Sequence, residues 1–362
     1  MKKKFSLKKL LPYAIIISAV LIFGIIFYKD LSKFVVEQLI YSVMKSRNVS
    51  YEDGLYVGLC GTGSPLPDIN RAGPCIAVLA GNHFFIVDAG EGSVKNVLLM
   101  NLPISRADAV LLTHFHSDHI ADLGELMLQR WAGGSNQEPI DVIGPIGVDQ
   151  VVQGFNLAYE LDAEYRVMHH GAEAMPPSGF GGVAKPFNLS NETNASVVVF
   201  DKDGVKITAF NVNHWPVYPA VGYRFEYKNR SVVISGDTAY SESLINNSIS
   251  ADVLFHEALN SVMVGIMNDY ANRTGVSLME RITHDIPSYH STPEDAAKIA
   301  ESANVKQLIY YHLIPPLPLK VLDNFFIGDA KNYYTGPIIV GEDGLLVFLP
   351  PNSDKIKITK VI

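Results

Sequence analysis

Cysteine is scarce in this chain of 362 residues, which contains only Cys60 and Cys75. Their separation does not match the paired spacing of cysteine-based zinc sites, and two cysteines cannot build the dense disulfide framework of a small secreted domain. Both lie near the ends of apolar segments that we expect to form neighbouring strands. A disulfide between them and a pair of buried thiols are equally good predictions.

An excess of basic residues is also absent. The net charge of the chain is -8, but residues 1–50 carry nine Lys and Arg against two Asp and Glu, a net of +7, which leaves -15 for residues 51–362. No local basic patch interrupts this acidic part. Because such a surface repels a polyanion, the sequence predicts that nucleic acid is not a partner.

Long hydrophobic runs are missing with one exception, the uncharged stretch 10–28, which follows five lysines. The stretch is long enough for one membrane-spanning helix, and it lacks the small-residue cleavage site of a signal peptide, which is the alternative interpretation. Because the lysines come first, we predict a single-pass anchor with a cytoplasmic N-terminus. The main domain would then be extracytoplasmic, or periplasmic in a Gram-negative cell.

The predicted division of the chain follows from this anchor. Its parts are a basic cytoplasmic tail (1–9), a transmembrane helix (10–28), a juxtamembrane helix and linker (29–50) and a folded domain (51–362). In the folded domain, short apolar strands such as 109–112 and 308–311 alternate with helical patterns such as 148–161 and 293–302. This alternation predicts an α/β layered domain.

Four residues that can bind a metal crowd into the sequence HFHSDH, residues 114–119, directly after an apolar strand. His114 and His116 project from the strand end toward one point. Asp118 and His119 begin the turn into the following helix and reach a second point beside the first. Imidazole and carboxylate together suit zinc or a similar divalent ion, so the motif predicts a metal centre.

Three further polar residues, His214, Asp237 and His312, each follow a predicted apolar strand. Ligand sites of α/β sheets collect at the carboxyl ends of strands, which makes these residues candidates for the same centre. Taken singly, each is explained at least as well as a cap or turn residue.

Together these segments resemble the metallo-β-lactamase fold superfamily. HFHSDH is similar to its HxHxDH motif, SGDT (235–238) to the segment of its bridging aspartate and YYHLIPP (310–316) to the segment of its last histidine. Within the superfamily the chain resembles the ribonuclease Z and zinc-dependent arylsulfatase branch, because GTGSPLPDINRAG, VDAGEG, HEAL and HST occur in that branch's order. The resemblance covers about residues 58–349, and it implies a four-layer αββα sandwich with the metal site at one edge.

The resemblance also assigns the metal ligands. It gives one metal to His114, His116 and His214, the other to Asp118, His119 and His312, and makes Asp237 the bridge between them. The implied cofactors are two Zn²⁺ ions, with Mn²⁺ or Fe²⁺ as alternatives, and the implied nucleophile is a hydroxide that bridges the two metals.

Three residues are predicted to be catalytic: Asp118, His290 and Glu257. His290 in HST resembles the element that protonates the leaving group, and Glu257 in HEAL would hydrogen-bond it and fix its tautomer. Helix capping is the alternative role of His290, although Thr292 already offers a cap. Asp118 counts both as a ligand and as a catalytic residue, and Asp88 in VDAGEG is expected to orient the ligands.

The sequence departs from ribonuclease Z in the interval 215–236, which is too short for the long arm that clamps tRNA in many bacterial members. The segment between His119 and His214 looks instead like the arylsulfatase-like subgroup. Its candidate pocket-lining residues are Tyr159, Tyr165, Arg166 and His169. A salt bridge with Glu160, Asp162 or Glu164 is an equally good interpretation of Arg166.

We therefore predict a membrane-anchored dinuclear zinc hydrolase that attacks a small sulfate or phosphate ester. The alternative with the same active site is a 3'-tRNA endoribonuclease of the ribonuclease Z type. The predicted partners are a small anionic ester as substrate and the membrane, and a homodimer is left open.

Overall fold

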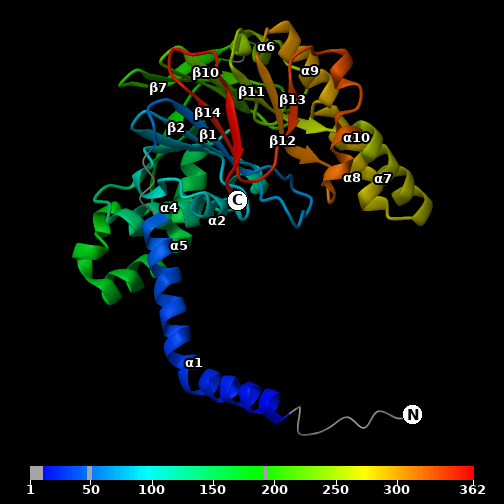
Figure 1. Cartoon of the computed structure of the whole chain (residues 1–362). Coiled ribbons are helices and arrows are strands. Elements are labelled where there is room, and N and C mark those ends of the chain that lie inside the picture. The colour runs from blue at the N-terminus through cyan, green and yellow to red at the C-terminus, as the bar shows by residue number, and fades with distance from the viewer. Residues whose placement is uncertain (1–10, 47–50, 191, 193) are drawn as a thin grey trace, which may run out of the picture. The chain divides into compact units, whose positions relative to one another are not determined.

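The computed structural model describes residues 11–46, 51–190, 192 and 194–362. The chain divides into two compact units, residues 1–51 and residues 52–362, and each is described by itself (Figure 1). The predicted basic tail lies outside the described residues.

One helix of the first unit, α1 (Leu11–Ser46), contains residues 11–28 of the predicted transmembrane stretch and continues beyond it. The later part is exposed and charged, and Lys33 pairs with Glu37 at 3.7 Å. Among the residues that the structure describes, no helix is long and apolar enough to cross a membrane. The predicted transmembrane anchor, and the extracytoplasmic location that depended on it, are therefore wrong. The charge break at Lys29 that defined the stretch is not a structural boundary, because the helix runs through it.

Two β-sheets form the second unit. The first has the order β15-β14-β1-β2-β3-β4-β5-β6. Its strands are β1 (Leu55–Gly61), β2 (Cys75–Ala80), β3 (His83–Val87), β4 (Ala109–Leu111), β5 (Ile140–Pro145), β6 (Gly182–Phe187), β14 (Leu345–Leu349) and β15 (Lys357–Lys360). The second has the order β13-β12-β11-β10-β9-β8-β7. Its strands are β7 (Ser196–Lys202), β8 (Val205–Asn211), β9 (Val221–Tyr227), β10 (Arg230–Ile234), β11 (Val253–Leu259), β12 (Gln307–Ile314) and β13 (Ile338–Val340).

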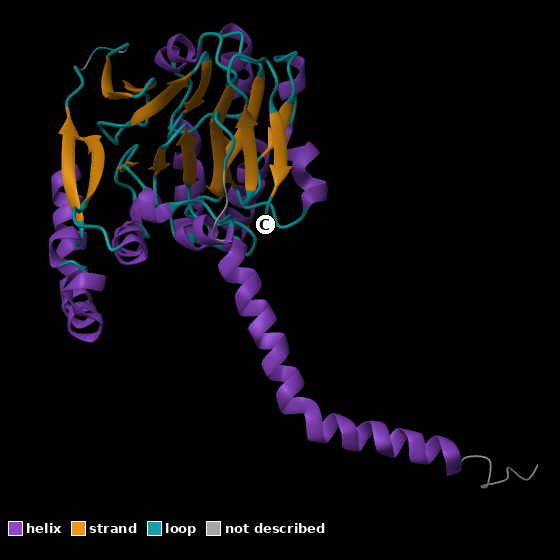
Figure 2. Cartoon of the chain, turned by 60° about the vertical axis from the view of Figure 1, so that its left-hand side comes forward, coloured by secondary structure: helices purple, strands orange, loops and turns teal. Residues whose placement is uncertain are grey.

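The main core lies between the two sheets. Val57 and Phe85 of the first sheet share one cluster of fully buried side chains with Phe225 and Ile309 of the second. Burying each such side chain contributes about 1.5–3 kcal/mol, so this interface holds the two sheets together. The α/β fold of two facing sheets is thus confirmed (Figure 2).

Helices cover the outer faces of the sheets. The α-helices of this unit are α2 (Ser93–Leu99), α3 (Ser117–Ile120), α4 (Leu123–Gly134), α5 (Val148–Ala174), α6 (Glu242–Ser248), α7 (Ser261–Thr274), α8 (Ser277–Asp285), α9 (Pro293–Ser302) and α10 (Asp323–Ile327). Short 3-10 turns lie at Ile104–Arg106, Pro177–Gly179, Ile286–Ser288, Lys320–Leu322 and Ala330–Asn332. Ala297 and Ile299 of α9 pack with Leu254 and Tyr310 in a second apolar cluster on the far side of the second sheet.

The start of α9 follows directly from its sequence. The Thr292 hydroxyl accepts a hydrogen bond from the Asp295 backbone N–H at 3.1 Å, and the Asp295 carboxylate accepts one from the Thr292 N–H at 3.4 Å. This reciprocal capping box, with Pro293 as the first helical residue, fixes the direction in which the chain leaves the preceding loop.

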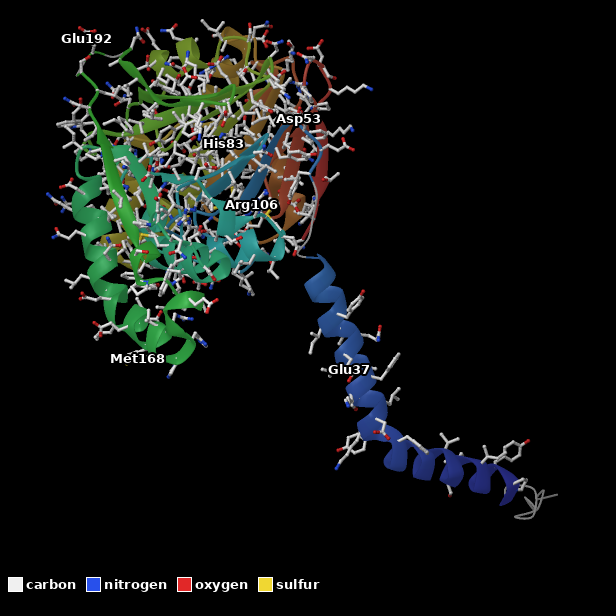
Figure 3. The ribbon with its side chains drawn as sticks, turned by 90° about the vertical axis from the view of Figure 1, so that its left-hand side faces the viewer. Glu37, Asp53, His83, Arg106, Met168 and Glu192 are labelled. Atoms are coloured by element: carbon white, nitrogen blue, oxygen red, sulfur yellow. A yellow bond between two sulfur atoms is a disulfide. The ribbon has the colours of Figure 1, made fainter. Side chains whose placement is uncertain are left out.

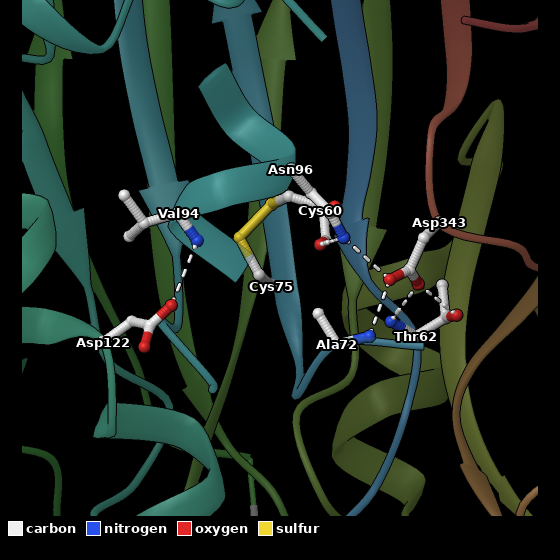
Figure 4. Close-up of a disulfide and its surroundings, with 8 residues drawn as sticks. All are labelled: Cys60, Thr62, Ala72, Cys75, Val94, Asn96, Asp122 and Asp343. Atoms are coloured by element: carbon white, nitrogen blue, oxygen red, sulfur yellow. Dashed lines mark hydrogen bonds between the residues drawn. A yellow bond between two sulfur atoms is a disulfide. The ribbon is translucent and has the colours of Figure 1, made fainter. Parts of the chain in front are cut away.

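Cys60 of β1 and Cys75 of β2 form a disulfide, with Cα atoms 5.0 Å apart (Figure 4). The structure thereby decides between the two interpretations that the sequence left open. The bond closes a loop of sequence separation 15, which corresponds to a stabilisation of about 3 kcal/mol in the chain-entropy picture. It ties down both ends of the loop that follows β1.

Candidate metal centre

The HFHSDH motif connects the end of β4 to the short helix α3. His114 and His116 lie in the connection itself, whereas Asp118 and His119 lie inside α3. The strand therefore delivers two imidazoles, and the first turn of the helix delivers a carboxylate and a third imidazole.

The second sheet brings the remaining candidates to the same place. Strands β8, β10 and β12 run in one direction, because β9 is antiparallel to both β8 and β10, and β10, β11 and β12 are parallel. Their carboxyl ends consequently share one edge of the sheet. His214 follows β8, Asp237 follows β10 and His312 lies near the end of β12.

His312 occupies an unusual backbone position. The pairing of β11 with β12 shifts by one residue between Tyr311 and Leu313, so His312 is the extra residue of a bulge. Its φ is +46°, in the left-handed region that non-glycine residues rarely adopt. A bulge of this kind re-aims a side chain, and such strain persists only where the surroundings impose it.

The donor atoms converge in two groups, and Asp237, a member of the first, also lies close to two histidines of the second. Within each group they lie within 4.8 Å of one another: His114, His116, His214 and Asp237 in the first, and Asp118, His119 and His312 in the second. The Nε2 atoms of His119 and His312 both lie 3.3 Å from Asp237 Oδ2, and those of His114 and His214 lie 3.8 Å from it.

The electrostatics of the centre favour a bound cation. Burial alone would raise the pKa of Asp237, but His312 and His119 outweigh it and hold that pKa well below its ordinary value. Burial would lower the pKa of His119, yet Asp237, Asp118 and Asp88 raise it well above its ordinary value. The site therefore concentrates negative charge around a buried imidazole.

Unsatisfied atoms provide a direct test of whether a metal fits. His119 Nε2 and Asp237 Oδ1 are buried and have no hydrogen-bond partner among the described residues. Leaving such a group unpaired costs about 1–3 kcal/mol. Ligands of a tetrahedral zinc, each 2.0–2.1 Å from the ion, lie about 3.3 Å apart, which matches the separations around Asp237. The residues fit a divalent metal.

The outer nitrogens of two candidate ligands, His119 and His214, are held by fixed acceptors. Asp88 Oδ2 accepts a hydrogen bond from His119 Nδ1 at 2.8 Å, and both oxygens of Asp88 also bind Thr113. The backbone carbonyl of Tyr289 accepts from His214 Nδ1 at 3.0 Å. Such contacts fix the tautomer and leave Nε2 free to bind a metal, as predicted for Asp88.

His290 lies beside the centre, and one of its ring nitrogens is within 4.8 Å of the donor atoms of Asp237 and His312. Its Nδ1 donates to Glu257 Oε1 at 3.0 Å. The same oxygen accepts the backbone N–H groups of Thr238 and Ser291. This leaves the Nε2 of His290 available on the side of the metal centre.

A cavity of about 820 Å³ opens next to Asp118. Its lining contains four basic residues, Arg71, Lys95, Lys320 and Lys360, and six acidic ones, Asp68, Glu91, Asp118, Asp323, Glu342 and Asp343. Lys320 and Lys360 pair with Glu342, and Arg71 donates to Thr62 and to Gly341. Lys95 is exposed and makes no ion pair with any residue that the structure describes.

Asp343 holds one wall of this cavity in place. Its partly buried carboxylate accepts hydrogen bonds from the Thr62 N–H and hydroxyl, the Ala72 N–H and the Asn96 amide, next to the disulfide (Figure 4). Sequence reasoning missed Asp343 and Lys95. The segment GTGSPLPDINRAG, which contains Thr62 and Ala72, was the signal that could have indicated this wall.

The predicted pocket-lining residues of α5 do not line this cavity. Arg166 pairs with Asp162 at 2.6 Å, so the alternative interpretation of Arg166, a local salt bridge, is the one that the structure shows. Tyr165 and His169 are exposed, and Met168 marks the outer end of α5, away from the strands (Figure 3). The ring of Tyr159 packs against Gly124 of α4.

Residues 83–313 match the family described as the beta-lactamase superfamily domain. The chain belongs to this superfamily. Ribonuclease Z of Mycobacterium sp. (strain KMS) is 36% identical over 262 residues, which are 72% of this chain and 85% of the relative. The predicted recognition is confirmed, and the branch is that of ribonuclease Z. The protein is a metal-dependent hydrolase that acts on ester bonds, as predicted.

Two solved structures share the fold. A metallo-beta-lactamase fold protein from Bacillus subtilis has a TM-score of 0.59 and 22% identity, covering 82% of this chain and 100% of the other. The short form of human tRNase Z has a TM-score of 0.58 and 21% identity, covering 82% of this chain and 99% of the other. At these identities the likeness establishes the fold alone.

The relatives overturn the predicted function and partners. They are ribonucleases by name, so the arylsulfatase-like interpretation with a small sulfate or phosphate ester is wrong, and so is the exclusion of nucleic acid. The physical reason is that the net charge of a whole domain does not decide what a single unpaired cation binds, and Lys95, in the lining of the cavity, is such a cation among the described residues. The interval 215–236 does lack an arm, since it holds the β9–β10 hairpin, but that absence did not exclude RNA.

Proposed function

We propose that this protein is a ribonuclease Z-type endoribonuclease that cleaves the 3' extension of tRNA precursors at a dinuclear zinc centre. The observation that carries the proposal is the His290–Glu257 pair beside the two donor groups. Hydrolysis of an RNA phosphodiester releases a poorly stabilised sugar alkoxide, which needs a proton donor at this position. The 36% identity to a ribonuclease Z supports the choice of substrate.

Seven side chains would hold the metals. His114, His116 and His214 are the proposed ligands of one ion, Asp118, His119 and His312 those of the other, and Asp237 is shared. Five imidazoles and two carboxylates form the donor set that zinc prefers over the harder ions. When bound, two such ions supply a water of lowered pKa and polarise the phosphoryl oxygen.

The chain's own residues move the protons. Asp118, whose side chain is 11% exposed, is placed to accept a proton from the attacking water as its oxygen bonds to phosphorus. As the bond from phosphorus to the ribose oxygen breaks, His290 Nε2 gives a proton to that oxygen. Glu257 is a positioning residue: it keeps the proton on Nδ1 oriented and stabilises the ring.

Binding of the RNA would begin at the cavity beside Asp118. Lys95 is the lining cation without an ion-pair partner among the described residues, so a phosphate is the natural group to neutralise it. Arg71 is held by Thr62 and Gly341 and is paired with Asp68 at 3.8 Å, so it gives the same wall a fixed guanidinium whose charge is already balanced.

The test is cleavage of a tRNA precursor with a 3' extension by the full chain, followed by mapping of the new ends. We expect one cut at the base of the extension, which disappears when a chelator removes the metal and returns when zinc is restored. Absence of cleavage by metal-loaded protein, or scattered cuts along the RNA, would contradict the proposal. An Asp162→Ala variant on the exposed face of α5 serves as a matched control that should cleave normally.

A further inference from the structure

The two tryptophans of the chain lie in opposite environments. Trp131 is fully buried, and its indole N–H donates to the Pro176 carbonyl at 2.8 Å. Trp215 is 73% exposed, although it directly follows His214, which is 1% exposed. Single exposed apolar residues are common on protein surfaces, but this one adjoins a proposed metal ligand.

The loop that carries Trp215 is fastened on both sides. The His214 carbonyl accepts the Val217 N–H at 2.8 Å, which closes a turn with Trp215 inside it. At the base of the loop, the Val212 N–H donates to the Ala220 carbonyl at 3.0 Å. Asn213 is bound to the loop of Asp237 through Thr238 Oγ1, at 3.0 Å. The backbone that carries the exposed indole is therefore held next to the centre.

The surroundings of the centre are asymmetric. The cavity is lined by Asp118 and by Lys95 but not by His214, whereas Trp215 directly follows His214 and does not line the cavity. A strand of RNA that crosses the centre would thus meet Lys95 in the cavity, unpaired among the described residues, and the open aromatic face of Trp215 beside His214. Unpaired bases stack on such faces whatever their identity, because every base has a π-face.

We infer that Trp215 stacks on an unpaired base of the RNA next to the scissile phosphate. The inference rests on the proposed function for the identity of the RNA. Stacking positions the strand without reading its sequence, and it supplies contact area on the side where the interval 215–236 carries no arm.

Tryptophan fluorescence tests the contact without any need for cleavage. Binding of a short single-stranded RNA that lacks the tRNA body is followed by the anisotropy of a label on the RNA and, in parallel, by tryptophan emission. We expect saturable quenching of the exposed tryptophan, which vanishes in Trp215→Phe because only buried Trp131 then emits. Binding without any change of emission would overturn the inference.

Kinetics with a modified precursor provide the second test. Trp215→Ala is expected to raise KM for the precursor about 5- to 150-fold with kcat within about twofold, and Trp215→Phe to recover part of the loss. An abasic nucleotide at the stacked position should raise the wild-type KM by a similar factor and add nothing in Trp215→Ala. Tyr270→Ala, on exposed α7, is the matched control and should leave KM unchanged.

The two proposals fail in different ways. Additive effects of the abasic nucleotide and Trp215→Ala, with normal cleavage, would remove the stacking contact and keep the proposed function. Quenching by RNA without cleavage of any precursor would keep the contact and remove the proposed function.

Discussion

The metal centre and helix α5 present their polar side chains in opposite ways. At the centre, His119 and His214 are buried and are held from behind by Asp88 and the Tyr289 carbonyl. On α5, Arg166 finds its partner one turn away on the same helix. Strand ends from two sheets force distant residues to converge, whereas a projecting helix satisfies its charges locally. The candidate reactive residues therefore lie at the strand ends, and the residues of the long helix α5 do not line the cavity.

The largest effect is expected from Asp237→Ala, which removes a carboxylate at the metal centre. The shared carboxylate is the atom group on which both donor sets converge, so its removal is expected to release both metals. Loss of metal catalysis is worth several kcal/mol, or on the order of 1,000-fold or more in rate. Metal analysis of the purified variant and precursor cleavage measure the two effects. Retention of full activity would show that Asp237 holds no essential metal.

His290→Ala separates proton donation from metal binding. We expect cleavage of the precursor to fall about 100- to 10,000-fold while both metals stay bound. Bis-p-nitrophenyl phosphate releases a phenolate that needs no proton, so its hydrolysis should change little. Glu257→Gln is expected to show a smaller loss with the same pattern, since Glu257 acts through His290. An equal loss with both substrates would indicate that the pair has only a structural role.

Asp88→Asn tests the support behind the ligands. Weakening the contact to His119 Nδ1 is expected to lower metal affinity about 10- to 100-fold, with kcat recovered when the metal is saturating. Titration of metal-depleted protein measures the affinity, and Asp141→Asn, at a partly exposed position of β5, is the control. A loss of kcat that no metal concentration restores would contradict a purely supporting role.

The smallest expected effect is on the salt dependence of RNA binding, and it is tested by comparing variants of Lys95 and Arg166. Lys95→Gln is expected to weaken precursor binding and to reduce the slope of log K against log salt by about one, because one phosphate contact disappears. Arg166→Gln, on α5, should leave the slope unchanged, since its charge is already paired with Asp162. Equal slopes for the two variants would show that the cavity does not contact RNA.

The parts that the sequence could predict are those encoded by local patterns. The capping box at Thr292 placed the start of α9, and the polar residues after apolar strands identified the side chains that the structure brings together. The bulge at His312 could not be predicted, because it depends on the pairing of β11 with β12. The cavity was also beyond prediction, since Arg71, Lys95 and Lys320 come from segments far apart in the chain.

Two errors arose from bulk properties. Net charge predicts that nucleic acid is excluded, although one cation such as Lys95, unpaired in the described part of the chain, can bind a phosphate on an acidic domain. The uncharged stretch 10–28 was read as a separate segment, although α1 runs on through the charges that follow it. Composition describes an average over many residues, and neither a binding site nor the end of a helix is decided by an average.

In the proposed function, cleavage of tRNA precursors depends on two metals that are both bound by Asp237. The most direct measurement is a titration of zinc into metal-depleted full-length protein, with precursor cleavage followed at each step. We expect no cleavage before zinc is added, and the full rate of cleavage when two equivalents of zinc are bound. Cleavage that needs no metal, or protein with two bound metals that leaves the precursor intact, would contradict it.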